Sequence, residues 1–396
     1  MERLKEVDSL RGLAAFSVLI GHFLNIFPDL YSSESNSHNF WINLIKFSPL
    51  HILWAAHEAV IFFFVLSGFV LALPYFYGKS KINYVSYLIK RICRIYFPYI
   101  IAVAISLTFS LLFYKGGIPY LSDWFNRIWS SQIDSKLLLD HLFLLGSFEN
   151  AKLNPVLWSL VHEMRISLIF PFIVKLVDRY NWKTNIIISI ITSTLGYLAN
   201  YLMFHYTLFS NDYFSTVQYA GYFITGAVIA KNYKIVVCKL KTANKTIKIF
   251  ALGIALLLYS HVWWVDTFVN EKVKFFHIPV LNELIISLSV SLILLISISS
   301  DFIKRGLNQK WLLYLGDISY SLYLYHAICL AAILYLLNGV LPISLLLTIS
   351  LLASFLISTI SYHYVEITSI KMGKYLSLNI NKSVLSNPQV NISDKF

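Results

Sequence analysis

The chain has 396 residues, of which 57% are hydrophobic and only 13% are charged. A soluble domain carries about 25% charged residues, so this composition excludes a soluble globule and predicts a polytopic membrane protein. The three cysteines, Cys93, Cys238 and Cys329, are scattered and form no CxxC pair, so we expect neither a disulfide framework nor a metal site.

Apolar stretches recur along the chain, each near the ~20 residues that a helix needs to cross a bilayer. The ten predicted spans are 10–28, 53–77, 95–114, 155–177, 185–207, 213–231, 246–265, 279–299, 315–337 and 341–363. We therefore expect an all-α membrane domain over residues 1–370 and a polar cytoplasmic tail over 371–396, with no appended soluble domain.

Basic residues are concentrated in alternate connections between these spans. One set of connections contains Lys90, Arg91 and Arg94, whereas the opposite set contains few basic residues, such as Lys115 and Arg127. Because positively charged connections stay in the cytoplasm, both termini are expected there, in a multi-pass protein of the cell inner (cytoplasmic) membrane. The net charge of +12 therefore reflects topology and not a nucleic-acid surface.

The first span contains two ionisable residues, Arg11 and His22. Their separation advances about 1100° around a helix, roughly 20° off three full turns, so both side chains share one stripe about 16 Å long. Ionisable groups within a membrane are costly and mark functional sites. The alternative is that Arg11 extends to the lipid headgroups and His22 bonds a neighbouring helix.

The second span also carries polar and small residues. His57 and Glu58, near the external end of that span, are expected at the membrane interface. The small residues Ser67 and Gly68 favour close packing of helices.

Arg91 and Arg94 follow in a basic amphipathic segment that leads into the third span. Their i, i+3 spacing places them on one face, and arginine binds phosphate oxygens through paired hydrogen bonds. A phosphate-bearing cytoplasmic ligand and anionic lipid headgroups are the two interpretations.

The longest external segment, 115–154, combines carboxylates with aromatic residues such as Trp124, Phe125 and Trp129. A connection of this length usually binds a ligand or covers a cavity. Stacked aromatic rings suit a carbohydrate, but they equally suit an interfacial aromatic belt.

Glu163, His326 and Glu366 interrupt the later spans. Glu163 lies in a Trp158–Arg165 cluster that opens the fourth span and either faces a central cavity or lies at the external surface. His326, in the ninth span, serves either a site or helix packing. Glu366, at the end of the tenth span, is expected at the interface.

Five motifs occur in one order along the chain and carry a family resemblance. They are Leu10-Arg11-Gly12 with His22, Val60–Phe69, Lys90-Arg91-x-x-Arg94-Ile-Tyr-Phe-Pro98, Leu157-Trp158-Ser159-Leu160-x-x-Glu163, and Ser319-Tyr-Ser321-Leu-Tyr-Leu-Tyr-His326. With these motifs the chain resembles the integral-membrane acyltransferase 3 family from about residue 7 to 374. One departure is Thr368, where the family often has proline two positions after the residue matching Glu366.

The resemblance implies transfer of an acyl group, usually acetyl, from cytoplasmic acyl-CoA to a hydroxyl of a cell-envelope or exported carbohydrate, free or lipid-linked. It implies that Arg11 and His22 form the site pair and that Arg91 and Arg94 bind the acetyl-CoA donor. Membrane lipids are the other expected partners.

The residue chemistry agrees with acyl transfer. A neutral imidazole suits a base for the acceptor hydroxyl, so His22 is the predicted base. Arg11 would hold a CoA phosphate or stabilise the oxyanion, and Glu163 and His326 would orient His22 or the acceptor. The alternative is a proton-coupled transporter of a small solute or glycan, with His22, Glu163 and His326 as a proton relay.

Overall fold

The computed structural model describes residues 3–31, 39–78, 83–130, 132–146, 152–207, 212–268 and 278–386. Over these residues the chain is helical and contains no strand, which confirms the predicted all-α class. Residues 131 and 147–151 of the external segment and 387–396 of the predicted tail lie outside the described residues.

Within the described residues, a helix occupies each predicted span. These helices are α1 (Lys5–Leu24), α4 (Ala56–Tyr77), α5 (Tyr84–Phe113), α8 (Leu157–Arg179), α9 (Trp182–Thr207), α10 (Asp212–Lys241), α11 (Lys245–Tyr259), α13 (Pro279–Ser299), α16 (Ser319–Leu337) and α17 (Ile343–Ser361). Seven described helical segments are long and apolar enough to cross a membrane, and α8, α10 and α11 are not among them. The polytopic membrane class is confirmed, and the count of ten spans stays a prediction.

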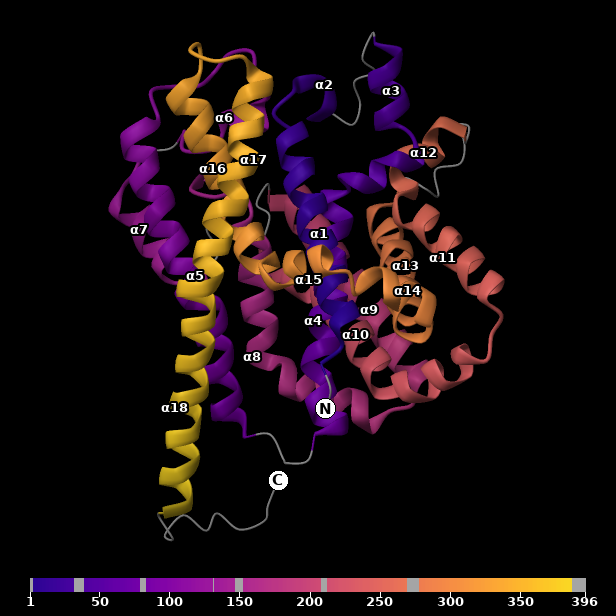
Figure 1. Ribbon diagram of the computed structural model, residues 1–396. Coiled ribbons are helices and arrows are strands. Elements are labelled where there is room, and N and C mark those ends of the chain that lie inside the picture. The colour runs from indigo at the N-terminus through magenta and orange to yellow at the C-terminus, as the bar shows by residue number, and fades with distance from the viewer. Residues whose placement is uncertain are drawn as a thin grey trace.

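Shorter helices complete the described fold. They are α2 (Pro28–Tyr31), α3 (Phe40–Lys46), η1 (Pro49–Leu53), α6 (Asp123–Asn126), α7 (Ser135–Leu142), α12 (His261–Phe268), α14 (Asp301–Leu307), α15 (Lys310–Asp317), the π-helical turn η4 (Tyr362–Glu366) and α18 (Ile367–Ser386). Figure 1 shows α2, α3, α6 and α12 toward the upper end of the bundle, whereas α18 runs along α5 to the lower end. The α1 helix runs from the lower toward the upper end.

Glycines set the closest helix contacts. A Cβ atom added to Gly68 on α4 would collide with the backbone of Phe223 on α10, and one added to Gly226 on α10 would collide with the carbonyl oxygen of Val65. The helices α4 and α10 therefore approach backbone to backbone, which confirms the expected packing role of Gly68. A similar contact between Gly12 and α15 fixes the lower half of α1.

Candidate active site

Two cavities lie along α1, and five of the six residues that the sequence singled out as a site line one or the other; the sixth, His326, contacts His22. The lower one, which we call the arginine cavity, has a volume of about 90 Å³ and is lined by Arg11, Arg91, Arg94 and Glu163. The upper one, the histidine cavity, has a volume of about 250 Å³ and is lined by His22. The structure thus places the two ends of the predicted Arg11–His22 stripe in different cavities.

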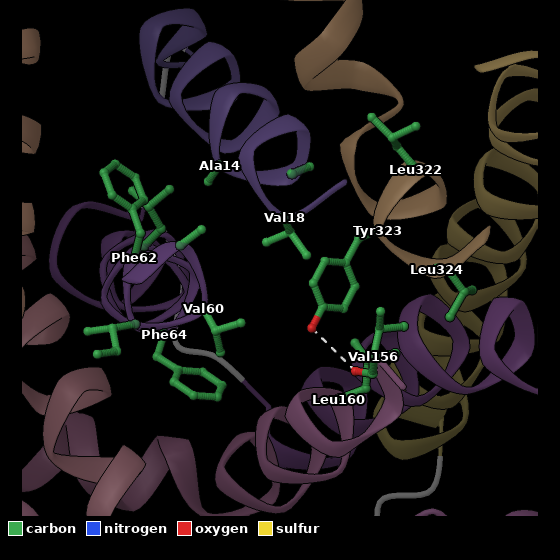
Figure 2. Close-up of a cluster of buried hydrophobic side chains, with 14 of the residues drawn as sticks. Ala14, Val18, Val60, Phe62, Phe64, Val156, Leu160, Leu322, Tyr323 and Leu324 are labelled. Carbon is green, nitrogen blue, oxygen red and sulfur yellow. Dashed lines mark hydrogen bonds between the residues drawn. The ribbon is translucent and has the colours of Figure 1, made fainter. Parts of the chain in front are cut away.

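The two cavities share two wall residues, Val60 on α4 and Tyr323 on α16. Figure 2 shows both side chains beside Val18 of α1, in the space between α1, α4, α8 and α16. The Tyr323 hydroxyl lies 2.5 Å from Ser159 Oγ and donates to the Val156 carbonyl at 3.3 Å. These bonds hold the tyrosine ring across the boundary between the cavities.

In the arginine cavity, Arg91 and Glu163 form an ion pair. Arg91 Nη2 donates to Glu163 Oε1 at 2.9 Å and also to Ser167 Oγ at 2.9 Å. Ser67 Oγ donates to the same Glu163 oxygen at 3.4 Å. The sequence favoured a helix-packing role for Ser67, and the structure places this residue in the lining of the arginine cavity.

The arginine cavity has an excess of two positive charges among its lining residues, since three arginines face a single carboxylate. Arg11 also lies within electrostatic range of Arg94, Glu163 and Glu366, and its Nη1 is 3.6 Å from Asp8 Oδ1. Such a cluster of guanidinium groups is suited to an anionic ligand, above all a phosphate.

In the histidine cavity, His22 contacts His326, which is 304 residues away in the sequence. His22 Nδ1 lies 2.8 Å from His326 Nε2, and the two rings stack with centroids 5.0 Å apart. His326 Nδ1 in turn lies 2.9 Å from the carbonyl oxygen of Leu322, one turn earlier on α16. Trp124 packs against the His22 ring at a centroid distance of 4.8 Å.

This chain of contacts fixes the protonation of the neutral pair. A carbonyl oxygen can only accept, so His326 Nδ1 carries the proton and donates to Leu322. Neutral His326 then has a lone pair on Nε2, which accepts from a protonated His22 Nδ1. His22 Nε2 is left with a lone pair, which is the form that a general base requires. Glu163 lies in the other cavity and does not contact His22.

His57, in the wall of the histidine cavity, belongs to a hydrogen-bond network that the sequence did not reveal. His57 Nε2 lies 3.0 Å from Glu283 Oε1, and Gln218 and Tyr222 each donate to Glu283 Oε2 at 2.6 Å. Glu58, expected at the membrane interface, is instead 2% exposed. Its burial is stabilised by a hydrogen bond of 2.9 Å that Trp263 Nε1 donates to Glu58 Oε1.

Glu366 also differs from the expected interfacial position. Its side chain is buried, and Oε2 accepts a hydrogen bond of 3.0 Å from Ser321 Oγ on α16. The π-helical turn η4 between α17 and α18 carries this residue, and π-helical turns often occur at functional sites.

The aromatic residues of the external segment pack against two different parts of the fold. Phe125 and Trp129 are buried and pack against Tyr335 at centroid distances of 5.1 and 5.7 Å. Within the described part of this segment, Trp124 is the aromatic residue that packs against His22, with the two rings tilted by 35°. No group of three or more metal-binding side chains is close enough to hold a metal ion in the part of the chain that the structure describes.

Comparison with known proteins agrees with this architecture. The model of the "Acyltransferase domain" family matches residues 4–363, so this chain belongs to that family of membrane acyltransferases. The resemblance seen in the five motifs is thereby confirmed.

Among individual relatives, the chain is similar to the O-acetyltransferase OatA of Staphylococcus aureus strains NCTC 8325 / PS 47 and COL. In both cases it is 24% identical over 336 residues, covering 78% of this chain and 52% of the relative. The chain therefore spans about half the length of the curated relatives it matches. No solved structure matches it.

Proposed function

We propose that this chain is a membrane O-acyltransferase of the cell inner membrane. It moves an acetyl group from cytoplasmic acetyl-CoA to a hydroxyl of a cell-envelope or exported carbohydrate. Family membership and the name of the relatives support O-acetyl transfer. The two cavities support a donor and an acceptor that reach the reaction from opposite ends of the bundle.

The arginine cavity is the proposed donor side. Its excess positive charge would attract the phosphates of acetyl-CoA, and the positive-inside rule assigns the lower end, where α5 begins with its basic residues, to the cytoplasm. At about 90 Å³ the cavity cannot hold all of CoA. The thioester end would enter it and reach the boundary at Val60 and Tyr323, which the histidine cavity shares, and the nucleotide would remain at its mouth near Arg91 and Arg94.

His22 is the proposed base. Its Nε2 lone pair takes the proton from the acceptor hydroxyl as the hydroxyl oxygen attacks the thioester carbonyl carbon. Negative charge develops on the carbonyl oxygen, and Arg11, which lines the donor cavity, would offset it. The carbon–sulfur bond then breaks, and the proton on His22 passes to the departing CoA thiolate.

The single observation that carries the proposal is the His22–His326–Leu322 relay, because it presents His22 as an oriented, unprotonated base. A transporter would not require this fixed tautomer, and family membership supports acyl transfer over transport.

The test uses the purified protein in vesicles with acetyl-labelled acetyl-CoA and envelope polysaccharide. We expect label in the polysaccharide with the native protein and a loss of at least 1,000-fold with His22→Ala, at unchanged membrane insertion. Full activity of His22→Ala would refute the assigned base. Accumulation of an unmodified solute without transfer of label would support the transporter instead.

A further inference from the structure

The upper wall of the histidine cavity contains a buried carboxylate oxygen with no hydrogen-bond partner. Glu58 lines the cavity and is 2% exposed; its Oε1 is bonded to Trp263, but Oε2 has no partner among the described residues. A buried carboxylate oxygen without a hydrogen-bond donor is energetically unfavourable. A position of this kind is therefore suited to accept a hydrogen bond from a ligand.

Aromatic rings line the same cavity as this carboxylate. Trp54, Trp158 and Trp263 all line the cavity. Trp263 is held rigidly, since its Nε1 donates to Glu58 and its ring stacks on His51 at 3.7 Å between centroids with 13° between the planes. Rigid aromatic walls with a few placed polar atoms are typical of small-molecule sites, and such rings pack well on the C–H face of a sugar.

The described lining of the cavity contains no lysine or arginine side chain that could pair with an anionic ligand. Within the described residues, the same lining contains one carboxylate, Glu58. Burial lowers the pKa of His51 to about 3, so this ring is neutral. His57 lies against the Glu283 carboxylate, which offsets any charge on that imidazole.

His51 adds a second hydrogen-bond acceptor. Its Nδ1 lies 3.0 Å from the carbonyl oxygen of Lys46 and must donate to it. The Nε2 atom of the neutral ring then carries a lone pair. Together with Glu58 Oε2 and His22 Nε2, the residues that line the cavity carry three acceptor atoms, a set suited to a ligand rich in hydroxyl donors.

We propose that the histidine cavity binds one ring of an uncharged sugar and rejects uronic acids. Glu58 Oε2 accepts a hydrogen bond from a hydroxyl near the one that is acylated, and the same carboxylate repels a negatively charged ring. The volume of about 250 Å³ lies just below the ~300–1,000 Å³ of common ligand sites, which suits a single ring. This inference rests on the proposed function, because it assigns the acceptor of that reaction.

The experiment measures binding and transfer separately with the full-length protein in nanodiscs. The probes are the methyl glycosides of glucose, galactose and mannose, each compared with its uronic-acid counterpart. Tryptophan fluorescence reports binding without a donor, and labelled acetyl-CoA reports transfer. We expect at least one neutral glycoside to bind 10-fold or more tightly than its uronic acid.

The decisive variant is Glu58→Gln, which keeps the shape of the side chain and removes its charge. We expect weaker binding of the neutral glycoside, by about 10- to 100-fold, together with tighter binding of the uronic acid, so that the preference disappears. A folding defect would weaken both ligands. The matched controls are Glu6→Gln, a buried carboxylate paired with Lys304 at the lower end of α1, and Trp182→Phe on α9; both should keep the native preference.

The outcomes separate the two proposals. Equal binding of uronic and neutral sugars, no binding of any probe, or an unchanged preference in Glu58→Gln would overturn the inference. Transfer to a carbohydrate without dependence on Glu58 would overturn the inference and leave the proposed function standing. Binding that depends on Glu58 without any acetyl transfer would support the sugar site and overturn the proposed acyl transfer.

Discussion

The role of His326 can be tested by replacing it with phenylalanine. The variant His326→Phe keeps a ring to stack on His22 but removes both nitrogens of the relay to Leu322. His22 then loses a hydrogen bond worth about 0.5–1.5 kcal/mol, and nothing fixes the proton on its Nδ1. A base held in the wrong tautomer or orientation forfeits much of the 10²–10⁴-fold gain that general-base catalysis provides.

We therefore expect kcat to fall about 100-fold, equivalent to about 2.7 kcal/mol at about 1.36 kcal/mol per tenfold change. The KM for acetyl-CoA should stay unchanged, because His326 does not line the arginine cavity. The assay is the initial rate of label transfer at saturating donor, with purified protein in vesicles.

A matched control separates this effect from general destabilisation. His141 on α7 is also buried, and its Nδ1 likewise bonds the carbonyl oxygen four residues earlier, at 2.8 Å. His141→Phe removes the same kind of bond away from His22 and should keep most of the activity. Native kcat in His326→Phe, or an equal loss in both variants, would refute the relay.

Three further predictions concern stability and donor binding. Arg91→Gln should raise the KM for acetyl-CoA at least 10-fold and destabilise the fold, since it leaves the Glu163 carboxylate without its cation. Adding Glu163→Gln should restore part of the melting temperature but should not restore the KM. His51→Phe should reduce the loss of Tm that the protein suffers when the pH is lowered. Burial lowers the pKa of His51 in the folded protein to about 3, from an ordinary value near 6.5. The free energy of unfolding therefore falls as the pH drops from 6.5 toward 3, by about 2–3 kcal/mol at pH 4.5. Equal Tm losses at pH 4.5 in the native protein and the variant would contradict this. Gly68→Ala should cost about 1–3 kcal/mol, because the added Cβ would collide with α10, whereas Gly253→Ala, with open space around it, should leave Tm within a few degrees of the native value.

Local helix geometry made part of the site predictable from the sequence. Arg11 and His22 lie on one helix, and a spacing close to three turns places them on one stripe. In the structure each of them lines one of the two cavities along α1. The i, i+3 pair Arg91 and Arg94 likewise lines one cavity. Such relationships depend on a single helix and need no knowledge of its neighbours.

Contacts between distant segments were not predictable in this way. His326 meets His22 across 304 residues, and no spacing rule links α1 with α16. Hydropathy treats the end of a span as a boundary with water, so it assigned Glu58 and Glu366 to the interface. In the fold, other helices cover both carboxylates, and Trp263 and Ser321 donate the hydrogen bonds that make this burial tolerable.

The boundary formed by Val60 and Tyr323 has a consequence for the energetics of the cell. A continuous aqueous pore between the arginine and histidine cavities would let protons leak down their gradient each time the site was empty. Both side chains are buried, and the tyrosine is held in place by Ser159 and Val156. A plug of this kind would let an acyl group be transferred while the membrane stays insulating. Removing the ring, as in Tyr323→Ala, should therefore open a path between the cavities that is measurable as a proton conductance.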